Sequence, residues 1–451
     1  MNSLLFFDII KIMESKKYLY VSFIATFFLL HFSLCASEDM NLTQNTPSKN
    51  WVVLPYIFSS DTTGFSGGVG VIKQGLLQPQ TTLVASVFAG LAQDIMLKGK
   101  EEEAHFKGGF ISFSNLKLPY TNRTFFSLIG LKSYFPNEKY YLDSSNNSNK
   151  EDVFSTSGDS NFFNTMLRYV LPLGEGLNNP EGLYTLHDGF AMNREEYGGG
   201  VPFVTGKTSI GIKTFYQSAN SENWLYPNTT HTLKSPKWNT NGLKFFLAHD
   251  NTDFDLNPSK GYQFQLQYSR DFGKGSSLQS WDFLDLKYNQ YFNLETFSFT
   301  KQNVLALSFW TGYSFSWDKD TQISPFIDKH RTPLWEGGRL GGFNRMRGYS
   351  NNRFSDKAVV YATAEYRTIL KWNPLRKNDY IPVAIDWFQV VGFVEAGRVH
   401  DTYNFDLFHD IKFDAGISLR AMAAQLPVRF DIAYGNEGFN IWVMIRQPFD
   451  F

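Results

Sequence analysis

The chain has 451 residues, of which 17% are aromatic and 19% are charged, and its mean hydropathy is -0.28. A membrane protein built from helices needs apolar runs of about twenty residues, which this hydropathy disfavours. The net charge of -1 gives no sign of nucleic-acid binding. Abundant aromatic residues and 35 glycines instead suit strands that are apolar on one face and polar on the other.

Residues 1–37 have the layout of a secretory signal peptide. Basic residues precede an apolar run, residues 18–34, and small residues follow it. Met13 is an alternative start. A single anchoring helix is the other interpretation, but the apolar run is short. The single cysteine, Cys35, lies in this leader, so no intrachain disulfide is expected, and a short polar spacer follows at 38–50.

The rest of the chain, residues 51–451, consists of segments in which apolar and polar side chains alternate with the period of a β-strand. The expected strands are 51–58, 64–74, 82–94, 104–115, 123–135, 161–171, 207–218, 240–250, 261–271, 281–293, 302–316, 357–371, 384–396, 410–421, 427–435 and 439–450. Their charges fall on one face. Near a membrane midplane each Arg or Lys facing lipid costs about 2–4 kcal/mol, whereas one facing an aqueous lumen costs little. We therefore predict an all-β fold, a transmembrane antiparallel β-barrel of about sixteen strands.

The last expected strand alternates to the carboxyl terminus. Its apolar face consists of Phe439, Ile441, Val443, Ile445, Phe449 and Phe451. No chain follows that could cover this face, so lipid is its simplest solvent, and only a closed barrel places strands in lipid. The seam of the barrel is expected between this strand and residues 51–58. Pro448 would weaken the ladder there, because proline lacks a backbone donor.

Turn lengths indicate how the barrel is oriented. Residues 75–80 and 116–122 are short, as periplasmic turns should be. Residues 136–160 and 316–356 are long, as expected of outward-facing loops. Residues 172–205 fit badly, because they should form a periplasmic turn and yet are long and glycine-rich. Either this segment is an ordered insertion or the strand register of the first half is wrong.

The strongest local signal lies in the long second loop, where residues 337–349 read Gly-Gly-Arg-Leu-Gly-Gly-Phe-Asn-Arg-Met-Arg-Gly-Tyr. Glycines raise the entropic cost of ordering a loop, and guanidinium groups favour carboxylate partners. A loop folded back into a charged lumen would satisfy the arginines. A disordered surface loop with chance arginines is the alternative. Candidate partners at inward-facing positions are Glu365, Glu395, Asp414 and Asp431.

Arg347-Gly348-Tyr349 resembles the arginine–glycine–aromatic loop motif of the BamA/TamA family, outer-membrane barrels of the bacterial surface antigen type. Further segments resemble that family in the same order. They are the acidic hairpin 250–262, Glu365-Tyr366-Arg367, the Phe-Val-Glu-Ala-Gly segment 393–397, and the last two strands at 427–431 and 447–449. No single segment is specific, but together they cover residues 240–451.

The resemblance implies a lumen-held loop in which Arg347 pairs with Glu395, in the segment that ends at Gly397. It also implies an integral protein of the bacterial outer membrane that inserts or moves proteins or lipids, with a client or a separate periplasmic partner. Phe449 and Phe451 would form a C-terminal signal for the barrel assembly machinery. Larger relatives carry POTRA domains before the barrel. Because only the spacer precedes this one, the chain resembles a barrel-only branch.

Other functions are less well supported. A passive pore or structural surface barrel without insertase activity is the alternative. Residues 64–68 match the Gly-x-Ser-x-Gly elbow of serine hydrolases, but that elbow needs a following helix and this sequence continues as a strand. We therefore predict that the protein is not an enzyme. The eight histidines have no metal-ligand spacing, so no metal or cofactor is predicted.

Overall fold

The computed structural model describes residues 51–449, apart from 61, 98–99, 142–143, 185, 193–197, 202, 223, 226–231, 234–236, 320–327, 334, 377–384 and 424–425. The predicted signal peptide, the spacer and Phe451 therefore lie outside the described residues. Among the residues that the structure describes, no helix is long and apolar enough to cross a membrane.

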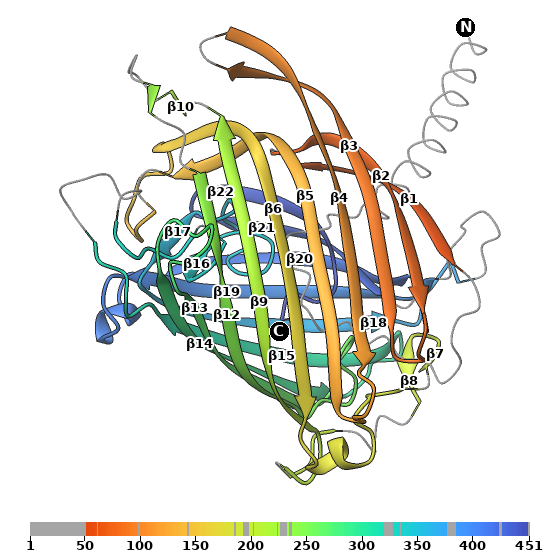
Figure 1. The fold of residues 1–451 in the computed structure, drawn as a ribbon. Coiled ribbons are helices and arrows are strands. Elements are labelled where there is room, and N and C mark those ends of the chain that lie inside the picture. The colour runs from red at the N-terminus through yellow and green to blue at the C-terminus, as the bar shows by residue number, and fades with distance from the viewer. Residues whose placement is uncertain are drawn as a thin grey trace, which may run out of the picture.

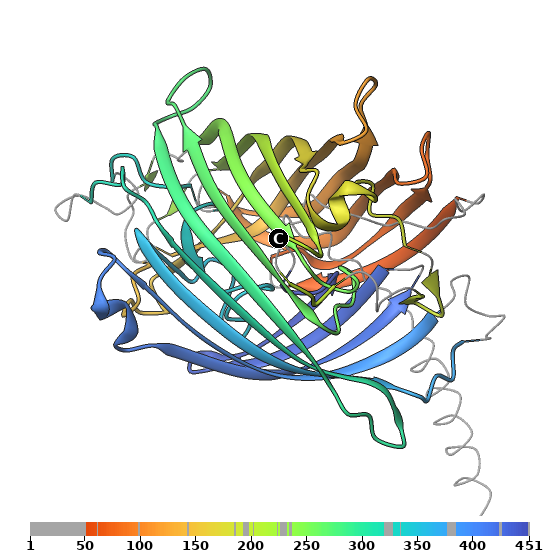
Figure 2. The same ribbon diagram turned by 90° about the horizontal axis from the view of Figure 1, so that it is seen from below.

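One antiparallel sheet of sixteen strands curls into a barrel (Figures 1 and 2). In the order in which they pair, the strands are β1 (Val52–Ser60), β2 (Gly64–Gln74), β3 (Thr82–Leu97), β4 (Lys100–Lys117), β5 (Thr124–Tyr141), β6 (Val153–Val170), β9 (Lys207–Glu222), β12 (Lys237–Asp250), β13 (Gly261–Asp271), β14 (Trp281–Leu294), β15 (Thr300–Tyr313), β18 (Ala358–Leu370), β19 (Ile385–His400), β20 (Lys412–Ala423), β21 (Leu426–Gly435) and β22 (Gly438–Ile445). All sixteen predicted strands are present, so the predicted fold class is confirmed.

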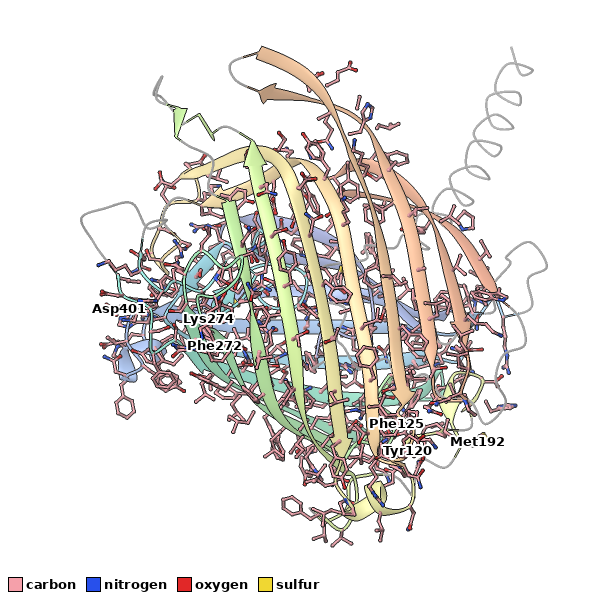
Figure 3. The ribbon with its side chains drawn as sticks, in the orientation of Figure 1. Tyr120, Phe125, Met192, Phe272, Lys274 and Asp401 are labelled. Atoms are coloured by element: carbon pink, nitrogen blue, oxygen red, sulfur yellow. The ribbon has the colours of Figure 1, made fainter. Side chains whose placement is uncertain are left out.

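The smaller elements lie in the connections between these strands. They are the hairpins β7–β8 (Leu186–His187 and Phe190–Ala191), β10–β11 (Trp224–Leu225 and Thr232–Leu233) and β16–β17 (Gly338–Leu340 and Phe354–Asp356), and the 3-10 turns η1 (Gly174–Leu177) and η2 (Phe405–Phe408). Figure 3 labels residues at the two ends of the barrel, with Tyr120 and Met192 at one end and Phe272, Lys274 and Asp401 at the other.

One predicted loop is shorter than expected. Residues 136–160 were expected to form a loop, but β5 continues through Pro136 to Tyr141, and β6 already begins at Val153. The register of β5 on β6 shifts between Phe135 and Glu138. An irregularity of this kind leaves a residue outside the ladder, which is where a strand tolerates proline.

The described residues of the segment 172–205 form an ordered insertion, and the alternative of a wrong strand register in the first half does not hold. Val170 at the end of β6 pairs directly with Ser209 near the start of β9. The insertion contains η1 and the β7–β8 hairpin, and it packs against the barrel. Tyr184 is buried and lies 5.5 Å from the ring of Phe254. The indole of Trp387 donates a hydrogen bond of 3.1 Å to the Gly189 carbonyl.

The inner wall has two chemically different halves. Strands β1 to β5 turn aromatic rings inward, and Phe58, Phe88 and Phe106 pack at centroid distances of 5.0 to 6.5 Å. Val69 and Val87, on the opposite face of these strands, are exposed. An exclusively polar inner face was therefore the wrong expectation for this half. Because both faces are apolar, the alternation of these strands is less clear in the sequence.

Residues 446–449 turn into the lumen instead of continuing β22. β22 stops at Ile445, and Arg446 has a left-handed φ of 72°. Phe449 is buried, and its carbonyl accepts a 2.8 Å hydrogen bond from the Asn289 amide of β14. The predictions that Phe449 faces lipid and that Pro448 weakens the seam ladder are therefore wrong. The turn at Arg446 ends the ladder before either residue.

β1 and β22 are the two edges of the sheet. Among the described strands no ladder joins them, although each of the other fourteen has a paired neighbour on both sides. One buried apolar cluster nevertheless reaches both edges. Tyr56 and Phe58 of β1 belong to the same cluster as Leu426 of β21, and Val443 and Ile445 of β22 pack against that cluster.

Candidate functional site: a loop held in the lumen

The loop between β15 and β18 folds back into the barrel. The β16–β17 hairpin narrows its base, and residues 341–353 form its tip. Gly341 and Gly342 have φ values of 97° and 118°, which favour glycine. A Cβ on Gly341 would lie 2.3 Å from the Ser350 carbonyl oxygen. The glycines thus allow the tight reversal that directs the following residues inward.

Arg347 is fully buried and contacts three carboxylates. Its guanidinium lies 2.8 Å from Glu365, 3.2 Å from Glu395 and 3.4 Å from Asp431. The guanidinium carbon also lies 3.4 Å from the ring centroid of Phe393. The contact with Glu395 that the resemblance implied is present, but it is one of three.

The charge state of Arg347 is strongly fixed. Burial alone would lower its pKa, but the neighbouring carboxylates, first Glu395 and then Glu365 and Asp431, outweigh that effect. The pKa of Arg347 is therefore held well above its ordinary value. The loop carries a permanent positive charge into the barrel.

Gly348 and Tyr349 fix the loop on the wall beside Arg347. The Gly348 amide donates a 2.9 Å hydrogen bond to the carboxylate of Asp414. A Cβ on Gly348 would lie 2.6 Å from the Asp414 side chain, so this close approach requires glycine. Tyr349 is buried, and its hydroxyl donates a 3.2 Å hydrogen bond to the Phe413 carbonyl.

Three further arginines extend this network. Arg367 and Arg420 each contact Glu365 at 2.8 Å, and Arg429 pairs with Asp431. We call the whole set the lumen cluster: Arg347, Arg367, Arg420, Arg429, Glu365, Glu395, Asp414 and Asp431, each no more than 5% exposed. Four cations and four acids leave it formally neutral. Sequence reasoning did not select the three additional arginines, although their inward positions in the strands were the available signal.

Two other predicted residues have different surroundings from those expected. Gly397 lies beneath the loop hairpin, where a Cβ would meet the Leu340 side chain at 2.8 Å. It therefore provides space for the hairpin. Phe449 lies against the lumen cluster, with the Arg367 guanidinium 4.7 Å from its ring centroid.

Desolvation determines what the lumen cluster can do. Burying charges costs about as much as their pairing returns, whereas removing one partner of a buried pair costs about 3–5 kcal/mol. The cluster therefore determines the position of the loop in the lumen. A sixteen-stranded antiparallel barrel with an arginine-anchored loop inside it defines the class of protein: a transmembrane β-barrel with a loop held in its lumen.

Comparison with known proteins identifies the family. The family model described as the Omp85 superfamily domain matches residues 143–441, and the chain belongs to this superfamily. This confirms the predicted BamA/TamA resemblance. Members of the superfamily are outer-membrane β-barrel proteins, so an outer-membrane location is supported by family.

Solved structures with the same fold include two CdiB proteins. CdiB from Escherichia coli matches at 11% identity with a TM-score of 0.53, covering 88% of this chain and 61% of that one. CdiB from Acinetobacter baumannii matches at 11% identity with a TM-score of 0.50, covering 88% and 59%. BamA from Haemophilus ducreyi lacking POTRA domains 1-3 matches at 14% identity with a TM-score of 0.47, covering 89% and 69%. This chain thus spans about 60% of the CdiB chains. A separate comparison with curated proteins found no match.

Proposed function

We propose that this protein assists the insertion or translocation of proteins or lipids at the bacterial outer membrane by opening between β1 and β22. The observation that carries the proposal is that these edges have no ladder between them among the described strands. A free strand edge presents unpaired backbone donors and acceptors that an incoming strand can use. Because no ladder joins β1 to β22 among the described strands, opening there would break no ladder hydrogen bonds.

The lumen-held loop supports the same proposal. Anchoring through Arg347 places the loop against β18 to β21, which are the strands that precede the β22 edge. The loop therefore braces the side of the barrel formed by β18 to β21. Enzymatic activity is not part of the proposal. The proposal also includes a client and a separate periplasmic partner. It further includes recognition of Phe449 and Phe451 by the barrel assembly machinery.

A direct assay separates this function from that of a passive pore. The purified chain in liposomes should accelerate the insertion of an unfolded outer-membrane barrel above the rate in protein-free liposomes. A heat-denatured sample of the same chain is the control. Steady conductance in a planar bilayer without any acceleration of insertion would favour the passive pore and contradict the proposal.

A further inference from the structure

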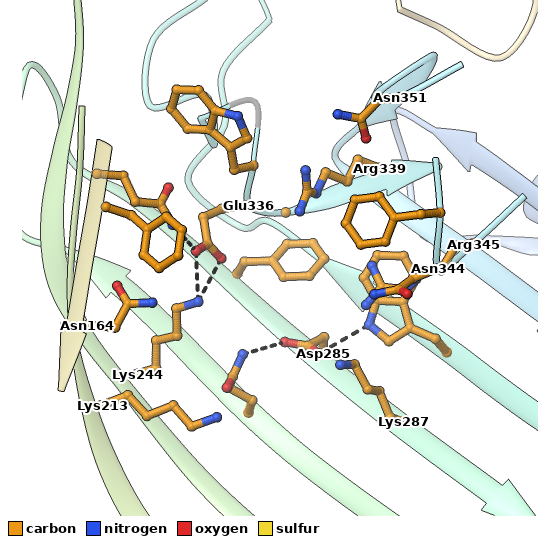
Figure 4. A pocket seen from close by; sticks show the side chains of 18 of the residues that line it. Asn164, Lys213, Lys244, Asp285, Lys287, Glu336, Arg339, Asn344, Arg345 and Asn351 are labelled. Atoms are coloured by element: carbon orange, nitrogen blue, oxygen red, sulfur yellow. Dashed lines mark hydrogen bonds and ion pairs between the residues drawn. The ribbon is translucent and has the colours of Figure 1, made fainter. Parts of the chain in front are cut away.

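A polar cavity lies between the lumen-held loop and a part of the wall that the lumen cluster does not use. Its volume is about 220 Å³, far more than the ~15 Å³ that one water needs. Strands β6, β9, β12, β13, β14 and β15 supply the wall side, and residues 335–351 of the loop supply the other side (Figure 4). The lumen cluster, by contrast, joins the loop to β18, β19, β20 and β21.

Positive charge predominates in this cavity. The charged residues that line it are Lys213, Lys244, Lys287, Arg339, Arg345, Asp285 and Glu336. Five cations and two carboxylates give a formal charge of +3, whereas the lumen cluster is formally neutral. An excess of one sign of charge along a cleft with low-dielectric walls creates a local potential that attracts the opposite charge.

The two carboxylates, already included in that formal charge, are held by residues of the lining. Glu336 forms a 2.8 Å ion pair with Lys244. Asp285 accepts hydrogen bonds from the Trp310 indole at 3.1 Å and the Gln267 amide at 3.4 Å. The guanidinium of Arg345 lies 3.7 Å from the ring centroid of Trp310, and this stacking holds it at the cavity wall.

The neutral lining adds a second recognition element. Six amide side chains line the cavity: Asn164, Gln217, Gln265, Gln267, Asn344 and Asn351. Amides both donate and accept hydrogen bonds, so they suit ligands with several hydroxyl groups. Arginine and lysine suit phosphate or carboxylate groups. A sugar carrying an anionic group combines both kinds of chemistry.

We propose that this cavity binds a phosphorylated or carboxylated saccharide, which bridges the loop to the wall. The anionic group would contact Arg339 and Arg345 of the loop together with Lys213 and Lys287 of the wall, and the amides would bind the hydroxyls. A bound ligand then holds the loop in the lumen from the side opposite its Arg347 anchor. The proposal is independent of insertase activity. Such a group can come from a soluble sugar phosphate or from the headgroup of lipopolysaccharide.

Thermal unfolding of the full chain in detergent tests the proposal, with glucose 6-phosphate, glucose and lipopolysaccharide as probes. Glucose 6-phosphate or lipopolysaccharide should raise the melting temperature, whereas glucose should not. A shift with the soluble phosphate assigns the site to a solute, and a shift with lipopolysaccharide alone assigns it to a headgroup. Equal shifts with glucose, or no shift with either anionic probe, would overturn the proposal.

Matched variants locate the site. The double variant Lys213→Gln/Lys287→Gln should weaken binding by at least about tenfold, because two charge-assisted contacts are lost. Lys274→Gln, which changes an exposed lysine outside the cavity lining, should leave binding unchanged. Glu336→Gln should have the opposite effect on affinity. It raises the formal charge of the cavity to +4, which should tighten binding. Unchanged binding in both the double variant and Glu336→Gln would refute the assignment.

Discussion

The indole of Trp442, on the edge strand β22, donates a 2.8 Å hydrogen bond to the backbone carbonyl of Arg347 in the lumen-held loop. This bond connects the anchor of the loop directly to one edge of the seam. Because Arg347 is itself fixed by three carboxylates, β22 is braced from inside the barrel. Movements of the loop and of this edge should therefore be coupled.

Replacing Trp442 with Phe tests that brace. An aromatic side chain remains but the indole donor is lost, which leaves the Arg347 carbonyl without this partner and should cost about 1 kcal/mol. Amide hydrogen exchange should accelerate in β22 and remain unchanged in β13 and β14. Trp372→Phe is the control, because Trp372 is exposed. Exchange in β22 at the wild-type rate would show that the bond does not brace the edge.

Arg347 should be the most sensitive position in the loop. Arg347→Met leaves Glu365, Glu395 and Asp431 facing one another in a buried space and should destabilise the protein by about 3–5 kcal/mol. Chemical unfolding in detergent measures this change. Arg376→Met, in an exposed ion pair with Asp188, should cost about 0–1 kcal/mol. Equal effects of the two substitutions would contradict the buried anchor.

A charge exchange should rescue only part of that loss. Arg347→Glu should be severely destabilising, and adding Glu395→Arg should recover some stability by restoring one ion pair. Rescue is incomplete because Glu365 and Asp431 still face the new carboxylate. Comparing the unfolding free energies of the two single variants and the double variant gives the coupling energy. A coupling energy of zero would show that Arg347 and Glu395 do not interact as a pair.

Gly348 should tolerate no side chain. A Cβ there would lie 2.6 Å from Asp414, so Gly348→Ala should cost about 1–3 kcal/mol through overpacking and displace the loop. Gly392→Ala is a matched control, since nothing lies within 4 Å of a Cβ at that position. Chemical unfolding followed by tryptophan fluorescence measures the stability of the two variants. Similar stability of the two variants would argue against the close contact.

The ordered insertion should show a pH dependence at Glu175. Burial raises the pKa of Glu175 above its ordinary value, and Lys207 opposes this only partly. A raised folded-state pKa stabilises the fold below the unfolded pKa of about 4.3, and that stabilisation is lost as the pH rises through the folded pKa. Glu175→Gln should therefore raise the melting temperature at pH 7 and not at about pH 4. The same shift at both values would contradict this explanation.

The strands could be predicted because a period of two is a local property of the sequence. Segments such as Gly261–Asp271 were predicted with the bounds found. The same alternation placed Glu365, Glu395, Asp414 and Asp431 inward, where they contact Arg347 or Gly348. Local patterns were therefore sufficient for the wall and for most partners of the loop.

Long-range contacts determined what could not be predicted. Residues 446–449 continue an apparent alternation, yet the left-handed backbone of Arg446 and the bond between Asn289 and Phe449 turn them inward. The role of Gly397 was also missed, because it depends on Leu340 approaching from a distant loop. Neither contact leaves a periodic signal in the sequence.

A reversible lock across the seam tests the central claim most directly. Val53→Cys in β1 is combined in turn with cysteines at Phe439, Ile441 and Val443 of β22 in a Cys35→Ser background, and the pair that forms a disulfide on oxidation is used. The oxidised protein should melt as the wild type does but lose the acceleration of barrel insertion in liposomes, and a reductant should restore it. An oxidised, fully crosslinked protein that inserts barrels at the wild-type rate would contradict opening between β1 and β22.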